Sequence, residues 1–178
     1  IGQGYVLATP IQLALMSARI ANGGKKIKPT LLKSPILHAS NANSVKVSEE
    51  NLNIIKRAME KVSLDEFGTG RNFRLGIKGV EMAGKTGTVQ VRRISTKERE
   101  SEEGVIKNED RIWEWRDHAL YVGYAPMDKP RYAISVIVEH GGSGSSKAGP
   151  IARDIMEATL TDDPTRFIPK NPIKKPLI

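Results

Sequence analysis

With 178 residues, the chain is long enough to form one domain with a sizeable hydrophobic core. It contains no cysteine, which excludes thiol catalysis and cysteine-ligated metal sites. The net charge of +8 comes from scattered basic residues, and aromatic residues make up only 5% of the chain, so we expect no base-stacking surface for nucleic acid. A basic surface that faces an anionic wall, membrane or substrate explains the charge as well as any specific partner does.

The chain starts Ile1-Gly2-Gln3-Gly4, without an initiator methionine or the charged region of a signal peptide. No apolar run approaches the roughly 20 residues that a membrane span needs. We therefore expect the chain to begin inside a longer protein.

Two helices are predicted in the first third of the sequence. The first begins at Thr9-Pro10, where Thr9 can cap and Pro10 suits the first helical position, and it ends at Gly23-Gly24. Apolar residues cover nearly all its faces, so we expect it to be deeply buried. The second follows the cap residue Ser48 and runs from residue 49 to about residue 63. Its expected buried stripe consists of Leu52, Ile55, Met59 and Val62.

The segments next to the second helix are predicted to lack helical structure. Residues 28–37 favour an extended conformation, and residues 39–47 form a polar loop. Residues 67–71 predict a turn that depends on its two glycines, with phosphate binding as the less favoured alternative.

Residues 81–91 form the clearest strand and the best candidate for a binding site. After Thr86, β-branched residues alternate with small or polar ones, as on a strand with two different faces. Lys85 brings a cation, and Thr86 and Thr88 bring hydroxyl groups on the face opposite Lys85. Gly87 has no Cβ, so a ligand can approach the backbone closely. This pattern favours an anionic, peptide-like ligand held along a strand edge.

The same stretch also fits a second motif. Residues 79–86 match the P-loop pattern G-x-x-x-x-G-K-[ST], and residues 132–139, an apolar run that ends in an acid, imitate its Walker B strand. A P-loop needs a buried strand before it and a helix that begins directly after the lysine. Here the residues after Lys85 are poor helix formers, and residues 72–78 are charged and interrupted by glycine. A P-loop NTPase is therefore kept only as an outside alternative.

Residues 92–117 are dense in charges of both signs and have no core periodicity, which predicts a solvated, partly disordered excursion between strands. Trp113 and Trp115 would share one face of an incipient strand. We expect them to anchor the core, with contact to a ligand or partner as the alternative. His118 has no nucleophile close in sequence and is expected to be structural.

The last elements complete a sheet. Residues 118–124 and 131–139 are joined by a short turn, which predicts an antiparallel hairpin. A flexible glycine-rich loop at 141–146 precedes a helix from Pro150 to about Leu160. Residues 161–178 contain four prolines and several lysines and predict an extended tail outside the fold. The expected fold class is α/β (α+β), with helices that cover a mainly antiparallel sheet.

Several segments together resemble one family. Residues 1–14 (IGQGYVLATPIQLA) and 20–24 (IANGG) are similar to the transpeptidase domain of class B penicillin-binding proteins. Residues 83–91 (AGKTGTVQV), 117–120 (DHAL), 124–126 (YAP) and 141–142 (GG) best fit the penicillin-binding protein 2 branch. The likeness covers residues 1–160 in the right order. It implies that this region is the C-terminal portion of a β-lactamase/transpeptidase-like domain, and that the fold is incomplete.

The resemblance implies acyl transfer through a serine ester. In this family a serine attacks a D-Ala-D-Ala stem peptide of peptidoglycan, D-alanine leaves, and the acyl group passes to the amine of another stem. Carried over to this chain, Lys85 is catalytic and supplies positive charge to the site. Thr86 and Thr88 bind the terminal carboxylate, the Thr88 amide is one of two oxyanion donors, and Gly87 leaves room for the substrate backbone. No cofactor or metal is implied.

The chain departs from the family in two motifs. No serine is followed by lysine three residues later (Ser-x-x-Lys) or by asparagine two residues later (Ser-x-Asn). Both motifs precede the Gly-Gln-Gly segment in this family, so we expect the nucleophile and its base upstream of Ile1. We therefore expect this chain alone to be inactive, because the covalent route needs the nucleophile.

The family likeness also implies ligands, partners and a location. The ligands are peptidoglycan stem peptides and the β-lactams that imitate them, and the partners are the upstream half of the domain and a cell-wall glycosyltransferase. The expected place is the periplasmic face of the bacterial inner membrane, in cell-wall elongation and cell shape. A D,D-carboxypeptidase or a β-lactamase-like serine hydrolase is the alternative function.

Overall fold

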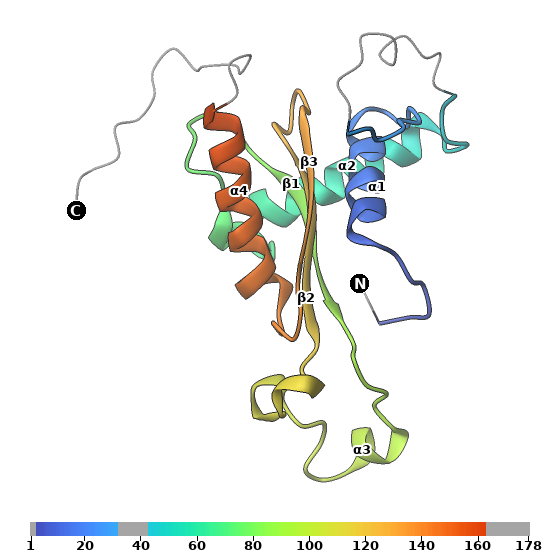
Figure 1. The fold of residues 1–178 in the computed structure, drawn as a ribbon, viewed down its shortest axis with the longest axis vertical. Helices are drawn as coiled ribbons and strands as arrows, with labels where there is room; N and C mark the ends of the chain where they lie inside the picture. The colour runs from blue at the N-terminus through green and yellow to red at the C-terminus, as the bar shows by residue number, and fades with distance from the viewer. Residues whose placement is uncertain (1–2, 32–42, 163–178) are drawn as a thin grey trace, which may run out of the picture.

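The computed structural model describes residues 3–31 and 43–162 of the chain. Its centre is a three-stranded antiparallel sheet in the order β1-β2-β3, formed by β1 (Ala83–Val89), β2 (His118–Ala125) and β3 (Tyr132–Val138). Helix α4 (Gly149–Asp162) lies on one face of the sheet and α1 (Pro10–Ala21) on the other (Figure 1). The predicted α+β arrangement with an antiparallel sheet is confirmed.

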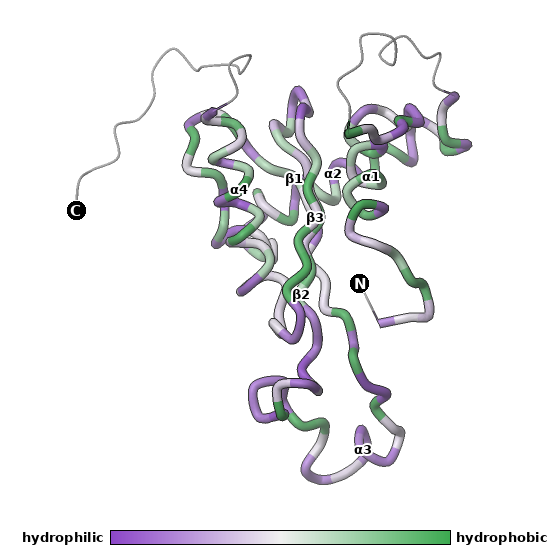
Figure 2. The backbone as a smooth tube through the Cα atoms, viewed as in Figure 1, coloured by the Kyte–Doolittle hydropathy of each residue, from purple (hydrophilic) through white to green (hydrophobic). Residues whose placement is uncertain are grey.

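The core lies mainly between the sheet and α4. Phe73, Met82, Tyr121 and Met156 are its largest fully buried members, and the Phe73 and Tyr121 rings meet edge to face at 5.3 Å between centroids. A smaller cluster on the α1 side joins α1, α2 (Glu49–Leu64), β1 and β2. Apolar residues accordingly follow the strands between the helices (Figure 2).

Both predicted N-terminal helices form where the capping residues place them. The Thr9 side chain accepts a hydrogen bond from the backbone of Gln12, and Pro10 is the first helical residue. Ser48 caps α2 through the Asn51 backbone in the same way. The starts of these helices are local features, so the sequence alone locates them.

The burial of these helices differs from the prediction. Only Ser17 and Ala21 of α1 are buried, because one side of the helix packs on the sheet while residues such as Ile11 remain 60% exposed. In α2, Leu52 and Met59 are buried as predicted. Ile55 is exposed and Val62 only half-buried, so the expected stripe is shorter than predicted.

The C-terminal part follows the predicted order of elements. Strands β2 and β3 form the predicted hairpin, in which Ala125 pairs with Tyr132 and Ala119 with Val138. The loop expected to be flexible contains a π-helical turn, η5 (Gly144–Ala148), which leads directly into α4. The predicted extended segment from residue 32 onward, residues 39–42 of the polar loop and the tail from residue 163 lie outside the described residues.

The charged excursion between β1 and β2 projects from one end of the sheet (Figure 1). It contains a short helix, α3 (Thr96–Glu100), and two 3-10 turns, η3 (Asn108–Asp110) and η4 (Trp113–Trp115). None of the described helices combines the length and the apolar character that crossing a membrane requires.

Candidate functional site

The Lys-Thr-Gly-Thr segment occupies the middle of β1, an edge strand of the described sheet. Lys85 pairs with Val122 of β2, and Thr88 with Ala119. A groove of about 290 Å³ runs beside this strand. It is lined by Gln3, Thr69, Lys85, Thr86, Gly87, Thr88, Ser143, Gly144 and Ser145. The structure therefore brings all four sequence-predicted site residues into one groove.

The cation and the Thr86 hydroxyl lie closer together than strand alternation suggests. Strand geometry directs successive Cβ atoms to opposite faces. The Lys85 side chain nevertheless turns back, so that its Nζ donates to the Thr86 carbonyl oxygen at 2.7 Å and lies 3.4 Å from Thr86 Oγ1. Lys85 itself remains exposed. An anionic group in this groove would thus meet one cation and a neighbouring hydroxyl.

Thr69 also lines this groove, although the sequence interpretation did not include it. Its Oγ1 lies 2.9 Å from Thr86 Oγ1, so the two hydroxyls form a hydrogen bond across the base of the groove. Thr86 is buried, and its hydroxyl lies within hydrogen-bond distance of the Thr69 hydroxyl and the Lys85 ammonium. Thr69 belongs to the predicted glycine-dependent turn after α2, where the Gly70 N–H donates to the Val62 carbonyl oxygen at 2.7 Å.

The P-loop alternative is wrong. Lys85 lies within a strand that continues to Val89, and no helix begins at or after the lysine before α3 in the excursion. The residues before Ala83 do not form a strand either. The helix N-terminus that would face phosphate in a P-loop is therefore missing at this position in the described chain.

Two buried phenols lie beneath the motif on β2. Tyr121 pairs with Thr86, and its ring fills the space beside Gly84, where a Cβ would collide with the ring. Burial raises the pKa of Tyr121, and burial followed by the charge of Glu60 raises the pKa of Tyr124 to about 12. Both phenols are therefore neutral at physiological pH and serve as packing.

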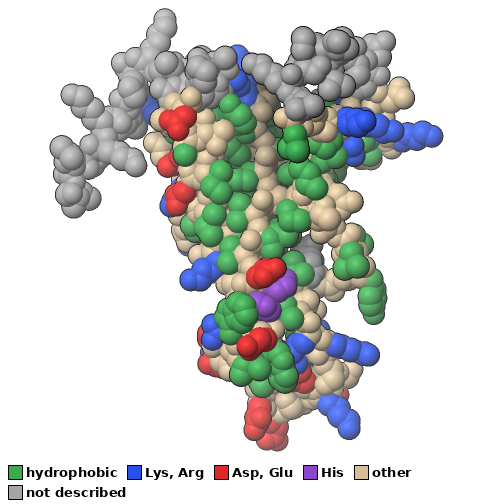
Figure 3. All heavy atoms as spheres, viewed as in Figure 1, with side chains coloured by type: hydrophobic (Ala, Val, Ile, Leu, Met, Phe, Trp, Pro, Cys, Tyr) green, Lys and Arg blue, Asp and Glu red, His purple; other side chains and the backbone are tan. Residues whose placement is uncertain are grey.

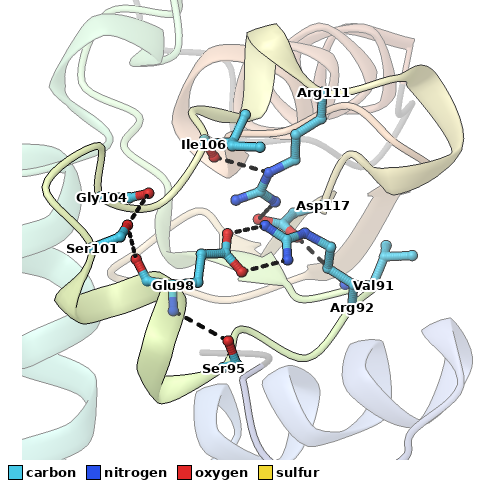
Figure 4. A network of polar contacts seen from close by, with 9 residues as sticks. All are labelled: Val91, Arg92, Ser95, Glu98, Ser101, Gly104, Ile106, Arg111 and Asp117. Atoms are coloured by element: carbon cyan, nitrogen blue, oxygen red, sulfur yellow. Dashed lines mark hydrogen bonds and ion pairs between the residues drawn. The ribbon is translucent and has the colours of Figure 1, made fainter.

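A polar network fixes the base of the charged excursion (Figure 4). Asp117, at the entrance to β2, accepts from Arg111 Nη1 at 3.2 Å and from the Val91 N–H at 3.4 Å, and both ionised side chains are largely buried. Arg111 also donates from Nε to the Ile106 carbonyl oxygen at 3.0 Å. Asp117 therefore joins the exit of β1 to the entrance of β2, and its pair with Arg111 holds the excursion at this point.

A second ion pair lies nearer the surface of the excursion. Arg92 and Glu98 form a bidentate pair, with one of its two hydrogen bonds at 2.8 Å. The hydrogen bonds from Arg92 lower the pKa of Glu98, and Glu98 in turn raises the pKa of Arg92. This pair orders the start of α3 against the strand end.

The two tryptophans do not anchor the core, so that prediction is wrong. They belong to the 3-10 turn η4 rather than to a strand, and Trp113 and Trp115 are 55% and 56% exposed. Trp113 instead packs on His140, with ring centroids 4.3 Å apart. His118 is structural as predicted, because its Nδ1 accepts from the His140 backbone N–H at 2.9 Å. The histidine side chains appear between acidic and apolar ones near the end of β3 (Figure 3).

The sequence and the fold both match a known family. The family model of the penicillin-binding protein transpeptidase domain matches residues 1–157. The chain belongs to the penicillin-binding protein transpeptidase family. Among relatives, it is 36% identical over 171 residues to the peptidoglycan D,D-transpeptidase MrdA of Haemophilus influenzae, covering 90% of this chain and 25% of that protein. It is 30% identical over 174 residues to PbpA of Mycobacterium tuberculosis, covering 92% of this chain and 32% of that protein.

Solved structures of penicillin-binding proteins show the same arrangement. The crystal structure of Pseudomonas aeruginosa PBP2 in complex with WCK 5153 is similar at a TM-score of 0.70 and 34% identity, over 97% of this chain and 34% of that one. PBP2 of Helicobacter pylori in complex with MreC is similar at a TM-score of 0.66 and 30% identity, over 91% of this chain and 26% of that one. The predicted resemblance is confirmed. The chain spans about a quarter of the length of the MrdA relatives that it matches.

Proposed function

We propose that this chain supplies the Lys-Thr-Gly wall of a peptidoglycan D,D-transpeptidase site. The observation that carries the proposal is the groove beside β1, where Lys85, Thr86 and Thr88 line one cavity along a strand edge. In this proposal residues 1–160 form the C-terminal portion of the transpeptidase domain, and residues 161–178 form a tail. The family match to residue 157 supports that division, and α4 continues two residues past it, to Asp162.

Each groove residue has a role that its position supports. Lys85 provides positive charge where negative charge develops on the substrate, and its contact with Thr86 keeps cation and hydroxyl together. Thr86 and Thr88 bind the substrate's terminal carboxylate, and the Thr88 amide stabilises the oxyanion. Gly87 admits the substrate backbone. Thr69 is added to this set, because it orients the Thr86 hydroxyl.

The nucleophile must come from another segment, since no Ser-x-x-Lys sequence exists in this chain. The serine oxygen attacks the carbonyl carbon of the penultimate D-alanine. The C–N bond to the last D-alanine breaks, and the serine proton passes to the departing amine, which leaves a serine ester. Transfer to an amine rather than to water is supported by the relatives, which are named D,D-transpeptidases.

A labelling experiment tests this function. A longer polypeptide that carries the family's Ser-x-x-Lys and Ser-x-Asn segments ahead of Ile1 should react covalently with fluorescent penicillin, and the present chain should not. Lys85→Ala in the longer polypeptide should slow the acylation about 100- to 1,000-fold, the usual cost of removing a preorganised electrostatic group. Lys78→Ala is the matched control, because Lys78 is exposed and does not line the groove. Labelling of the present chain, or equal rates for both variants, would contradict the proposal.

The wider setting belongs to the same proposal. We expect peptidoglycan stem peptides and β-lactams as ligands, a glycosyltransferase as partner, and action at the periplasmic face of the inner membrane in cell-wall elongation. The names of the relatives as peptidoglycan D,D-transpeptidases and the solved Helicobacter pylori complex of PBP2 with MreC support this setting. Co-purification of the longer polypeptide with membranes and with glycosyltransferase activity would test it.

A further inference from the structure

A second groove adjoins the Lys85 groove. It measures about 690 Å³, within the usual range for sites that hold small ligands. The two grooves share Thr88 and Ser143, so they meet at the end of the motif strand. The far part of the second groove is lined by Glu109, Trp113, Glu139, His140 and Lys147.

The aromatic floor of the second groove is held rigidly. His140 has a backbone φ of 55°, a left-handed conformation that is uncommon outside glycine and is often retained at functional positions. Its backbone N–H donates to His118 Nδ1, and its ring Nδ1 donates to the Arg116 carbonyl oxygen, both at 2.9 Å. Trp113 covers the His140 ring on one side yet remains 55% exposed. A half-exposed indole on a fixed support offers its surface to a ligand.

The charges at the rim fit a ligand with charges of both signs. Two of the lining ions already have partners: Arg116 donates to two backbone carbonyl oxygens, and Asp117 is paired with Arg111. Glu109, Glu139 and Lys147 are exposed at the rim. Two carboxylates beside an indole face suit an ammonium group, and the lysine suits a carboxylate.

We propose that the second groove is the acceptor subsite, which binds a peptide whose side chain ends in an amino-acid head group, an ammonium beside a carboxylate. The inference rests on the proposed function, because transfer joins two peptides at one carbonyl carbon. The acceptor nitrogen attacks the serine ester, the C–N bond forms, the C–O bond to serine breaks, and a proton from the amine returns to the serine oxygen. The acceptor must therefore lie in a groove continuous with that of the donor.

The chain's own fluorescence tests acceptor binding. Its two tryptophans are Trp113 and Trp115, so Trp115→Phe leaves the groove residue as sole reporter and Trp113→Phe leaves the residue outside the groove. The titrant is the tripeptide Ala-γ-Glu-diaminopimelate, whose side chain carries the required head group. Two derivatives complete the set: one acetylated on the side-chain amine, and one with lysine in place of diaminopimelate.

The expected and contrary results are distinct. In the Trp115→Phe chain the tripeptide should change the emission saturably, and acetylation should weaken binding about tenfold or more. The lysine peptide should bind several-fold more weakly, because the partner of Lys147 is lost. The Trp113→Phe chain should show no change. Equal binding of the acetylated peptide, or an equal response from both variants, would overturn the proposal.

A kinetic measurement separates this inference from the proposed function. In the longer polypeptide, the acyl-enzyme partitions between hydrolysis and transfer to the tripeptide amine. Glu139→Gln should lower the ratio of transfer to hydrolysis about fivefold or more, whereas Trp115→Phe should leave it unchanged. Failure to form any acyl-enzyme would refute the transpeptidase assignment itself. A normal acyl-enzyme with an unaltered ratio in Glu139→Gln would refute the acceptor subsite alone.

Discussion

The buried pair at the base of the excursion gives the sharpest stability prediction. Asp117→Asn keeps the shape of the side chain but leaves the Arg111 guanidinium, in a residue only 8% exposed, without its counter-charge. Removing one partner of a buried ion pair costs about 3–5 kcal/mol. The Ile106 carbonyl still accepts from Arg111, so we expect the lower end, about 3 kcal/mol. With a urea dependence of about 2 kcal/mol per molar, the unfolding midpoint should fall by about 1.5 M.

Urea unfolding followed by circular dichroism measures this shift, and Glu98→Gln is the matched control. Glu98 is also an acid paired with an arginine in the excursion, but solvent screens that pair near the surface. Its removal should therefore move the midpoint far less. If Asp117→Asn and Glu98→Gln unfold at the same urea concentration, the buried Arg111–Asp117 pair does not stabilise the fold as described.

Three further predictions concern other parts of the fold. Thr69→Val removes the 2.9 Å hydrogen bond to Thr86 and should slow penicillin acylation of the longer polypeptide about five- to tenfold, whereas Thr69→Ser should retain the rate; equal rates would contradict this role. Gly144→Ala places a Cβ against the backbones of β1 and β2 and should lower the melting temperature by several degrees, unlike Gly4→Ala, which has open space; similar melting curves would count against the close packing. Because burial raises the folded-state pKa of Tyr124 to about 12, above the value of about 10 in an unfolded chain, the unfolded state loses this proton first. Stability should therefore decline from about pH 10 to pH 12, and Tyr124→Phe should make this decline smaller; an equal decline in both proteins would refute the burial.

The sequence predicts those parts of the fold that depend on neighbouring residues. Thr9-Pro10 and Ser48 mark helix starts through contacts three residues away, and the alternation after Thr86 marks a strand. Lys85 could be placed on that strand for the same reason. The P-loop alternative could be set aside because the helix that it needs is a local feature too.

The remaining features depend on contacts between distant segments. Thr69 joins the site only because the turn after α2 meets β1, 17 residues along the chain. Trp113 is exposed because η4 turns it onto His140, which lies beyond two strands. The burial of α1 depends on which of its apolar faces meets the sheet. A single sequence carries no local signal for such encounters.

Gly144 packs directly against the sheet, and this packing limits how a peptide can lie in the Lys85 groove. An added Cβ at Gly144 would touch the backbones of Gly87 and Leu120, so this segment, which lines the Lys85 groove, has no space to move toward the strands. This wall of the Lys85 groove is therefore packed directly on the sheet. An occupant of the groove meets a wall whose position is set before it binds.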